Sequence, residues 1–390
     1  MHAKMPNHAI KAFMTKTSSK RAFLQFRCIA PLLALCCAVA ASAQSSARVG
    51  LTTRIFHPKE ARNWRGSQAK ELHCTIWYPA AGSAIETKQF IGPPGAPLFE
   101  AGSATPHAEF TPSLQQLPLI VLSHGTGGSA LQLAWLGTAL ARAGFIAIAV
   151  DHPGNNATEP YTAEGFVLWW ERATDLSDVL DGILADPDIG PHVDTSRIGA
   201  AGFAIGGHTA LELAGATTDV GVFYDMCRDH PTEILCHVPE MKDFTSPEQM
   251  LQTVRKSSGE SLARSADSFR DPRVKAVFAI SPALSQTQTA DSLHQIRIPV
   301  ELVVGAADPI APAAANADYL RANIHNARET ILPGGVAHYT FLDTCTAAGK
   351  SQLPTYCTDA PGVDRDAVHA QVSEMAITFF THSLKIGKGK

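Results

Sequence analysis

Short apolar runs alternate with stretches of helical periodicity along most of the chain, and this alternation restricts the possible folds more than any other feature. The clearest apolar runs are 117–123, 145–151, 197–203, 274–281 and 299–305. Helical patterns occupy 131–143, 168–185, 207–214 and 367–384. Strands that alternate with helices in this way form a parallel sheet with helices on both faces. We therefore predict an α/β fold with a mostly parallel central sheet flanked by helices.

The composition of the 390 residues excludes two other classes of protein. Hydrophobic residues make up 45% of the chain and charged residues 17%, whereas a disordered chain combines low hydrophobicity with high net charge. The formal net charge is −4, from 32 Lys and Arg against 36 Asp and Glu, and no long basic block is present. A nucleic-acid partner is therefore not expected.

The first 43 residues have the pattern of a cleavable export signal. The basic residues before the apolar run over 28–41 are Lys16, Lys20, Arg21 and Arg27. Ala41-Ser42-Ala43 then predicts cleavage before Gln44. The apolar run is shorter than the roughly 20 residues that cross a bilayer, so no membrane span is expected. We predict an exported protein, periplasmic or extracellular, whose residues 44–390 form a single domain.

Five of the eight cysteines follow the predicted signal, and export places them where disulfides persist. Cys227 and Cys236 are close in sequence, as are Cys345 and Cys357, and each pair lies in a loop-like stretch. We predict these two pairs as disulfides, although sequence alone does not fix connectivity. Cys74 lies in an apolar stretch and is expected to be a buried free thiol. No cysteine has zinc-type spacing, so no metal site is expected.

Two stretches interrupt the strand–helix alternation. Residues 80–116 are rich in Gly and Pro, and residues 219–272 are polar, with one predicted helix around 247–256. We interpret both as insertions on the rim of the sheet, where loops carry specificity.

The segment Gly202-Phe203-Ala204-Ile205-Gly206-Gly207 lies between a predicted strand and a predicted helix. That context matches Gly-x-Ser-x-Gly, a strained strand-to-helix turn that presents a nucleophilic serine. Here the central residue is Ala204, which has no nucleophilic atom and no proton to transfer.

Three further segments supply the groups that accompany such a turn. Ser123-His-Gly-Thr-Gly-Gly128 matches a loop that donates an oxyanion-hole N–H, so the predicted donors are the N–H groups of Thr126 and Ile205. Asp308 follows a predicted strand, and His338 follows two glycines. The order 204, 308, 338 is that of nucleophile, acid and base in α/β hydrolases. Asp308 would hold the imidazole tautomer, and His338 would take the nucleophile's proton.

Each of these segments also has an ordinary structural interpretation. A Gly-x-Ala-x-Gly-Gly sequence can be a simple tight turn, and an Asp before Pro can cap a helix. The occurrence of all the segments in order, each at a strand end, favours the catalytic interpretation. His124 and His152 are candidate substrate-binding residues that can instead hold loops. Trp169 and Trp170 either cover the cleft or pack on the core.

The motifs GFAIGG, SHGTGG and DHPGNN (151–156), together with the acid and histidine segments, resemble secreted bacterial dienelactone-hydrolase-like proteins. These are close to the platelet-activating-factor acetylhydrolase branch of the α/β-hydrolase fold. The likeness covers most of residues 49–384. It implies a carboxylic ester hydrolase without metal or organic cofactor, a small-molecule ester as substrate, and serine at position 204. The sequence departs from the family at that position.

Ala204 predicts a hydrolase scaffold with little or no turnover. Loss of a triad serine costs on the order of a millionfold in turnover, so we expect activity only if serine is restored. The alternative is a natural pseudoenzyme that binds an ester or acid. A third class, a partner-binding domain, has no motif in its favour. The intact acid, base and oxyanion loop favour a recent or engineered loss of serine, whereas the export signal argues against engineering. The acyl length of the substrate and the oligomeric state are left open.

Overall fold

The computed structural model describes residues 47–111, 116–237, 240, 242 and 246–385, which belong to one compact unit. The predicted signal peptide, its cleavage site and its three cysteines lie outside the described residues. Among the helices that are described, none is both long and apolar enough to cross a membrane.

The described part of the chain contains an 11-stranded sheet in the order β10-β9-β8-β7-β5-β6-β2-β1-β4-β11, with β3 paired to β4. All neighbouring pairs from β10 to β6 are parallel, whereas β2 pairs antiparallel with both β6 and β1. The predicted α/β fold with a mostly parallel sheet is confirmed. The strands are β1 (Arg48–Phe56), β2 (Leu72–Ala80), β3 (Thr87–Ile91), β4 (Phe99–Pro106), β5 (Leu117–Ser123), β6 (Ile146–Val150), β7 (Val193–Phe203), β8 (Val274–Ile280), β9 (Val300–Gly305), β10 (Ala327–Leu332) and β11 (Thr344–Cys345).

The five apolar runs predicted as strands correspond to β5, β6, β7, β8 and β9. These strands are buried on both faces, which explains their continuous apolar sequences. The strands β1 and β10 mix polar and apolar residues, so the sequence has no continuous apolar run that would predict them as strands. Within the Gly- and Pro-rich stretch 80–116, β3 and β4 form an antiparallel pair that extends the sheet, an ordered structure that its composition did not indicate.

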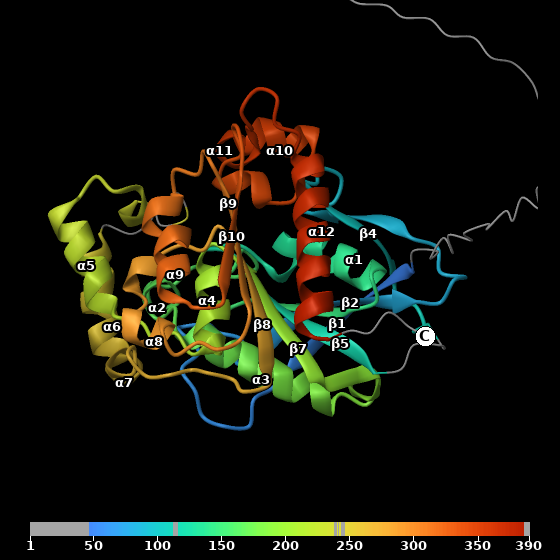
Figure 1. Ribbon diagram of the computed structural model, residues 1–390, viewed down its shortest axis with the longest axis horizontal. Coiled ribbons are helices and arrows are strands. Elements are labelled where there is room, and N and C mark those ends of the chain that lie inside the picture. Colours follow the sequence, from blue (N-terminus) through green and yellow to red (C-terminus); the bar gives the residue numbers. More distant parts are fainter. Residues whose placement is uncertain (1–46, 112–115, 238–239, 241, 243–245, 386–390) are drawn as a thin grey trace, which may run out of the picture. The chain divides into compact units, whose positions relative to one another are not determined.

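Two groups of helices cover the two faces of the sheet. Helices α1 (Ala134–Arg142) and α12 (Arg365–Ser383) lie side by side over one face, as Figure 1 shows. Helices α3 (Glu171–Ala185), α4 (Ile205–Ala214) and α9 (Ala317–Asn323) pack on the other face. The remaining helices are α2 (Ala163–Val167), α5 (Val220–Asp229), α6 (Pro247–Ser257), α7 (Gly259–Ala263), α8 (Ala290–Leu293), α10 (Ala347–Gln352) and α11 (Pro354–Cys357).

A third apolar cluster lies beneath the helices of residues 219–272. Phe223 and Cys227 of α5 and Met250 of α6 pack there against Trp169 and Trp170. In Figure 1, α5, α6 and α7 gather together in yellow at one end of the sheet. Both tryptophans are buried, and Trp169 also lines a pocket. The insertion therefore has a small core of its own.

Both predicted cysteine pairs lie at disulfide distance. The sulfur atoms are 1.95 Å apart in Cys227–Cys236 and 2.05 Å apart in Cys345–Cys357. The first pair ties the end of α5 to the loop that follows it, and the second ties β11 to α11. Cys74 of β2 is buried as a free thiol.

Candidate active site

Ala204 forms the sharp turn between β7 and α4. Its backbone has φ 54° and ψ −121°, in the left-handed half of the map, and such a conformation costs about 1–3 kcal/mol in a residue other than glycine. The turn is held from β8, because the Ala204 N–H donates to the Ile280 carbonyl at 2.9 Å and the Ala204 carbonyl accepts from the Ala283 N–H at 3.1 Å. The strain is therefore imposed by the surrounding structure.

Flanking glycines make this turn possible. A Cβ atom on Gly202 would lie 2.1 Å from the Gly206 carbonyl oxygen, and one on Gly206 would lie 2.0 Å from the Ser123 carbonyl oxygen. Any side chain at either position would overlap with backbone that cannot move aside. The Gly-x-Ala-x-Gly pattern is thus required by the close approach of β5, β7 and α4.

Asp308 and His338 form a buried hydrogen-bonded pair at the ends of β9 and β10. His338 Nδ1 donates to Asp308 Oδ2 at 2.7 Å. Asp308 Oδ1 accepts the N–H groups of Ile310 and Ala311 at 2.9 and 2.8 Å. Burial would raise the pKa of Asp308, but the charge and hydrogen bond of His338 outweigh it, so that pKa lies below its usual value. The carboxylate is therefore ionised and orients the imidazole.

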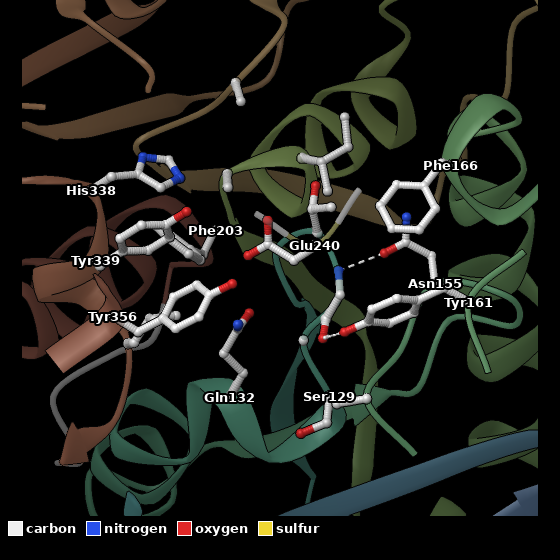
Figure 2. Close-up of a pocket in the computed structure, with 18 of the residues that line it drawn as sticks. Ser129, Gln132, Asn155, Tyr161, Phe166, Phe203, Glu240, His338, Tyr339 and Tyr356 are labelled. Carbon is white, nitrogen blue, oxygen red and sulfur yellow. Dashed lines mark hydrogen bonds between the residues drawn. The ribbon is translucent and has the colours of Figure 1, made fainter. Parts of the chain in front are cut away.

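The N–H groups of Thr126 and Ile205 have no hydrogen-bond acceptor within the described ranges. The loop that contains Thr126 is nevertheless fixed. The Gly127 N–H donates to Asn155 Oδ1 at 2.6 Å, and the Tyr161 hydroxyl donates to the Gly127 carbonyl at 2.9 Å (Figure 2). Two unoccupied donors on rigid loops are the arrangement that an oxyanion hole requires.

Thr126, Ala204, Ile205 and His338 all line one pocket of about 640 Å³. The His338 ring also contacts Phe203, the residue before Ala204, with ring centroids 4.7 Å apart. Both sequence stretches interpreted as insertions contribute walls. The wall residues from these stretches are Ile91, Gly92, Leu98, Phe99, Phe223, Tyr224, Leu235, Glu240 and Met250.

His124 and His152 do not line this pocket, which corrects the expectation that they contact substrate. Both are buried. The backbone N–H of His152 donates to His124 Nε2 at 3.2 Å, so Nε2 is an acceptor and the ring proton of His124 lies on Nδ1. That Nδ1–H group donates to the Gly125 carbonyl at 2.6 Å. Burial and the nearby Arg172 lower the pKa of both histidines, to about 3 for His152. Both rings are neutral and support the oxyanion loop, residues 123–128, on the side away from the pocket.

His152 is the centre of a second Ser–His–Asp arrangement, here called the buried Ser–His–Asp chain. The Ser123 hydroxyl lies 2.9 Å from His152 Nε2, and His152 Nδ1 lies 2.7 Å from Asp175 Oδ2. All three residues are 0% exposed. Asp175 also forms ion pairs with Arg62 and Arg65. Sequence reasoning missed this chain because Asp175 lies within α3, where it read as one polar residue of an amphipathic helix.

Sequence reasoning also missed three polar residues of the pocket wall: Glu240, Tyr339 and Tyr356. The Glu240 carboxyl group points toward the Tyr356 hydroxyl in Figure 2, and burial raises the pKa of Glu240. These residues come from loops and short helices that only the tertiary fold brings together. In the part of the chain that is described, no group of three or more His, Cys, Asp or Glu side chains could hold a metal ion.

The parallel sheet, the strained elbow and the acid–base pair at successive strand ends together define the class of α/β hydrolases. A model of the "Alpha/beta hydrolase family" matches residues 120–370, more than half of the chain, and the protein belongs to this family. Which branch of the family it represents, and whether its ancestor had serine at position 204, stay predictions.

Curated relatives match over short stretches. The chain is 31% identical over 98 residues to Lipase 1 of Moraxella sp. (strain TA144), and 31% identical over 103 residues to Cutinase est1 of Thermobifida alba. These stretches cover 25% and 26% of this chain, and 28% and 31% of the relatives. The chain therefore matches about a third of each relative's length.

Among solved structures, a ferulic acid esterase from Streptomyces cinnamoneus superposes with a TM-score of 0.55 at 19% identity, over 90% of this chain and 94% of that chain. At this identity the likeness concerns the fold alone.

Proposed function

We propose that the protein is an exported carboxylic ester hydrolase of the dienelactone-hydrolase-like type, disabled because Ala204 occupies the nucleophile position. One observation carries this proposal. The strained elbow at Ala204 opens on the same pocket as the His338–Asp308 pair and the unoccupied N–H groups of Thr126 and Ile205. The lipase and cutinase names among the curated relatives agree with ester chemistry.

With serine at position 204, each group has a defined role. The serine Oγ attacks the ester carbonyl carbon while His338 takes its proton, and the carbonyl oxygen becomes an oxyanion bound by the N–H groups of Thr126 and Ile205. The carbon–oxygen bond to the alcohol breaks as His338 returns the proton to the leaving alcohol. Water then cleaves the acyl-enzyme by the same route. Asp308 keeps the imidazole oriented and stabilises the imidazolium.

Ala204 removes only the attacking atom. The methyl group cannot form the acyl-enzyme, so the chain as written retains oxyanion binding and substrate binding but not covalent catalysis. The expected turnover is on the order of a millionfold below that of a serine form.

The second candidate is a pseudoenzyme that binds an ester or a carboxylic acid without turnover. The observation in its favour is the pocket of about 640 Å³, which is retained although the nucleophile is absent. The two disulfides support export in either case, because such bonds persist in oxidising compartments.

Ala204→Ser tests the proposal directly. We expect the serine form to hydrolyse short-chain nitrophenyl esters and to react with a fluorophosphonate probe, while the protein as written does neither. The control is the double variant Ala204→Ser with His338→Ala, which should lose both properties. A serine form that folds but neither hydrolyses nor labels would favour the ligand-binding candidate.

A further inference from the structure

The described pocket wall has carboxyl groups and no basic side chain other than His338. Its charged side chains within the described ranges are those of Asp151, Glu240 and Asp343, and no Lys or Arg lines it. Asp151 has a structural task, because its Oδ1 accepts the N–H of Ala130 at 2.5 Å. The other two carboxyl groups have no comparable explanation.

Glu240 lies directly over the oxyanion loop. A Cβ atom placed on Gly127 would lie 2.7 Å from Glu240 Cγ, so the glutamate chain crosses the loop one residue after Thr126. In Figure 2 its carboxylate points toward the hydroxyl groups of Tyr339 and Tyr356. A group bound to this carboxylate would therefore sit beside a carbonyl held in the oxyanion hole.

Within the described ranges no Lys or Arg forms an ion pair with Glu240, and the basic group whose charge acts on it is His338. Elsewhere the fold supplies such partners, as in the contacts of Asp175 with Arg62 and Arg65. Asp343 lies in the same pocket and is 2% exposed, and no side chain donates a hydrogen bond to its carboxyl group, although Arg365 lies close by and donates to its backbone carbonyl at 3.2 Å. Burying a carboxylate without a cation is costly, so burial raises the pKa of Glu240, and a ligand cation can supply the missing partner.

Aromatic rings stand on both sides of Glu240. Tyr339 and Tyr356 meet edge to face with centroids 4.8 Å apart, and Tyr161 lies on the other side near Phe166 at 5.4 Å. All three tyrosines line the same pocket as Glu240, and its charge raises the pKa of each of them. Ring faces attract organic cations, and most strongly in a site shielded from water.

We propose that Glu240 and its surrounding tyrosines form a subsite for an organic ammonium group, so that the pocket selects esters that carry a compact cation close to the scissile carbonyl. This inference deepens the proposed function and rests on it, because it assumes that an ester carbonyl occupies the oxyanion hole. The carboxylate supplies the charge, the rings supply a desolvated wall, and the neighbouring N–H groups hold the carbonyl.

The test compares two esters of the same shape: acetylcholine, and the neutral isostere in which tert-butyl replaces trimethylammonium. Calorimetric titration of the protein as written, which does not turn over, gives both dissociation constants. We expect the charged ester to bind about tenfold more tightly. Glu240→Gln and Tyr356→Phe should each reduce that ratio, Glu240→Gln to near one. Glu233→Gln, an exposed glutamate of the same insertion that does not line the pocket, is the matched control and should keep the ratio.

Equal affinity for the two esters, no measurable binding of the charged ester, or a preference that persists in Glu240→Gln would each overturn the inference. The same pair of esters given to the Ala204→Ser form separates the two proposals. Hydrolysis of both esters without a charge preference would refute the cation subsite and leave the hydrolase proposal standing. A Glu240-dependent preference in binding, with no hydrolysis by the serine form, would refute the hydrolase proposal and support the subsite.

Discussion

The described part of the molecule contains two His–Asp pairs with the same Nδ1–Oδ2 distance in two different settings. His338 Nδ1 lies 2.7 Å from Asp308 Oδ2, and His152 Nδ1 lies 2.7 Å from Asp175 Oδ2. In the first pair, His338 lines the pocket but the elbow beside it carries alanine. The second has a serine hydroxyl on its histidine but no exposed surface, because Ser123 is sealed behind the oxyanion loop.

Residue identity and spacing therefore do not by themselves define a catalytic site. Asp308 has backbone N–H groups and His338 as partners, so its histidine stays available to a ligand. Asp175 is held by Arg62 and Arg65 as well, and it serves as the centre of a buried charge network. Access to the pocket separates a catalytic arrangement from a structural one.

The largest effect that distinguishes the two pairs is expected on turnover. In the Ala204→Ser form, Asp308→Asn should lower kcat by roughly 10⁴-fold, because an amide no longer fixes the imidazole tautomer. KM should change by only a few fold, since Asp308 does not line the pocket. Steady-state kinetics on a nitrophenyl ester measures both constants. Retention of more than a tenth of kcat would contradict the assignment of Asp308.

The next effect is expected on stability, at the other pair. Asp175→Asn should lower the free energy of unfolding by about 3–5 kcal/mol, because it leaves two buried arginines without their shared carboxylate. Urea unfolding followed by tryptophan fluorescence measures the loss. Asp308→Asn is the matched comparison and should cost less, since the amide oxygen can still accept backbone N–H groups. A larger loss for Asp308→Asn would contradict the structural role of Asp175.

The smallest effect is expected for the serine of the buried chain. Ser123→Ala removes one hydrogen bond to His152 and should cost about 1 kcal/mol of stability. In the Ala204→Ser form it should leave fluorophosphonate labelling intact, because the probe cannot reach a sealed hydroxyl. Peptide mapping of the labelled protein identifies the modified residue. Modification at Ser123 would show that the buried chain opens to solvent.

The sequence predicted the parts of the molecule that depend on local pattern. Doubly buried strands such as β5 read as continuous apolar runs, and the glycines around Ala204 marked a turn that only a close backbone approach explains. The positions of Asp308 and His338 followed from strand ends. These features could be predicted because each depends on a few consecutive residues.

The remaining features depend on contacts between distant segments. Asp175 meets Arg62, Arg65 and His152 only after α3 packs on the sheet, and nothing in its helix marked it as the centre of a network. Glu240 reaches the oxyanion loop from an insertion whose course has no periodic signal. The choice between the two roles considered for His124 and His152 could not be made from the sequence, because burial depends on the whole fold.

The backbone at residue 204 has an evolutionary consequence. A chain that had lost its catalytic role could accept glycine there and relax, yet the turn keeps a left-handed geometry that alanine bears at a cost. Alanine codons and one family of serine codons differ only in their first base. A single base substitution would therefore place a hydroxyl on a turn that already has the required shape, so the genetic distance from this chain to one with a serine elbow is the shortest that mutation allows.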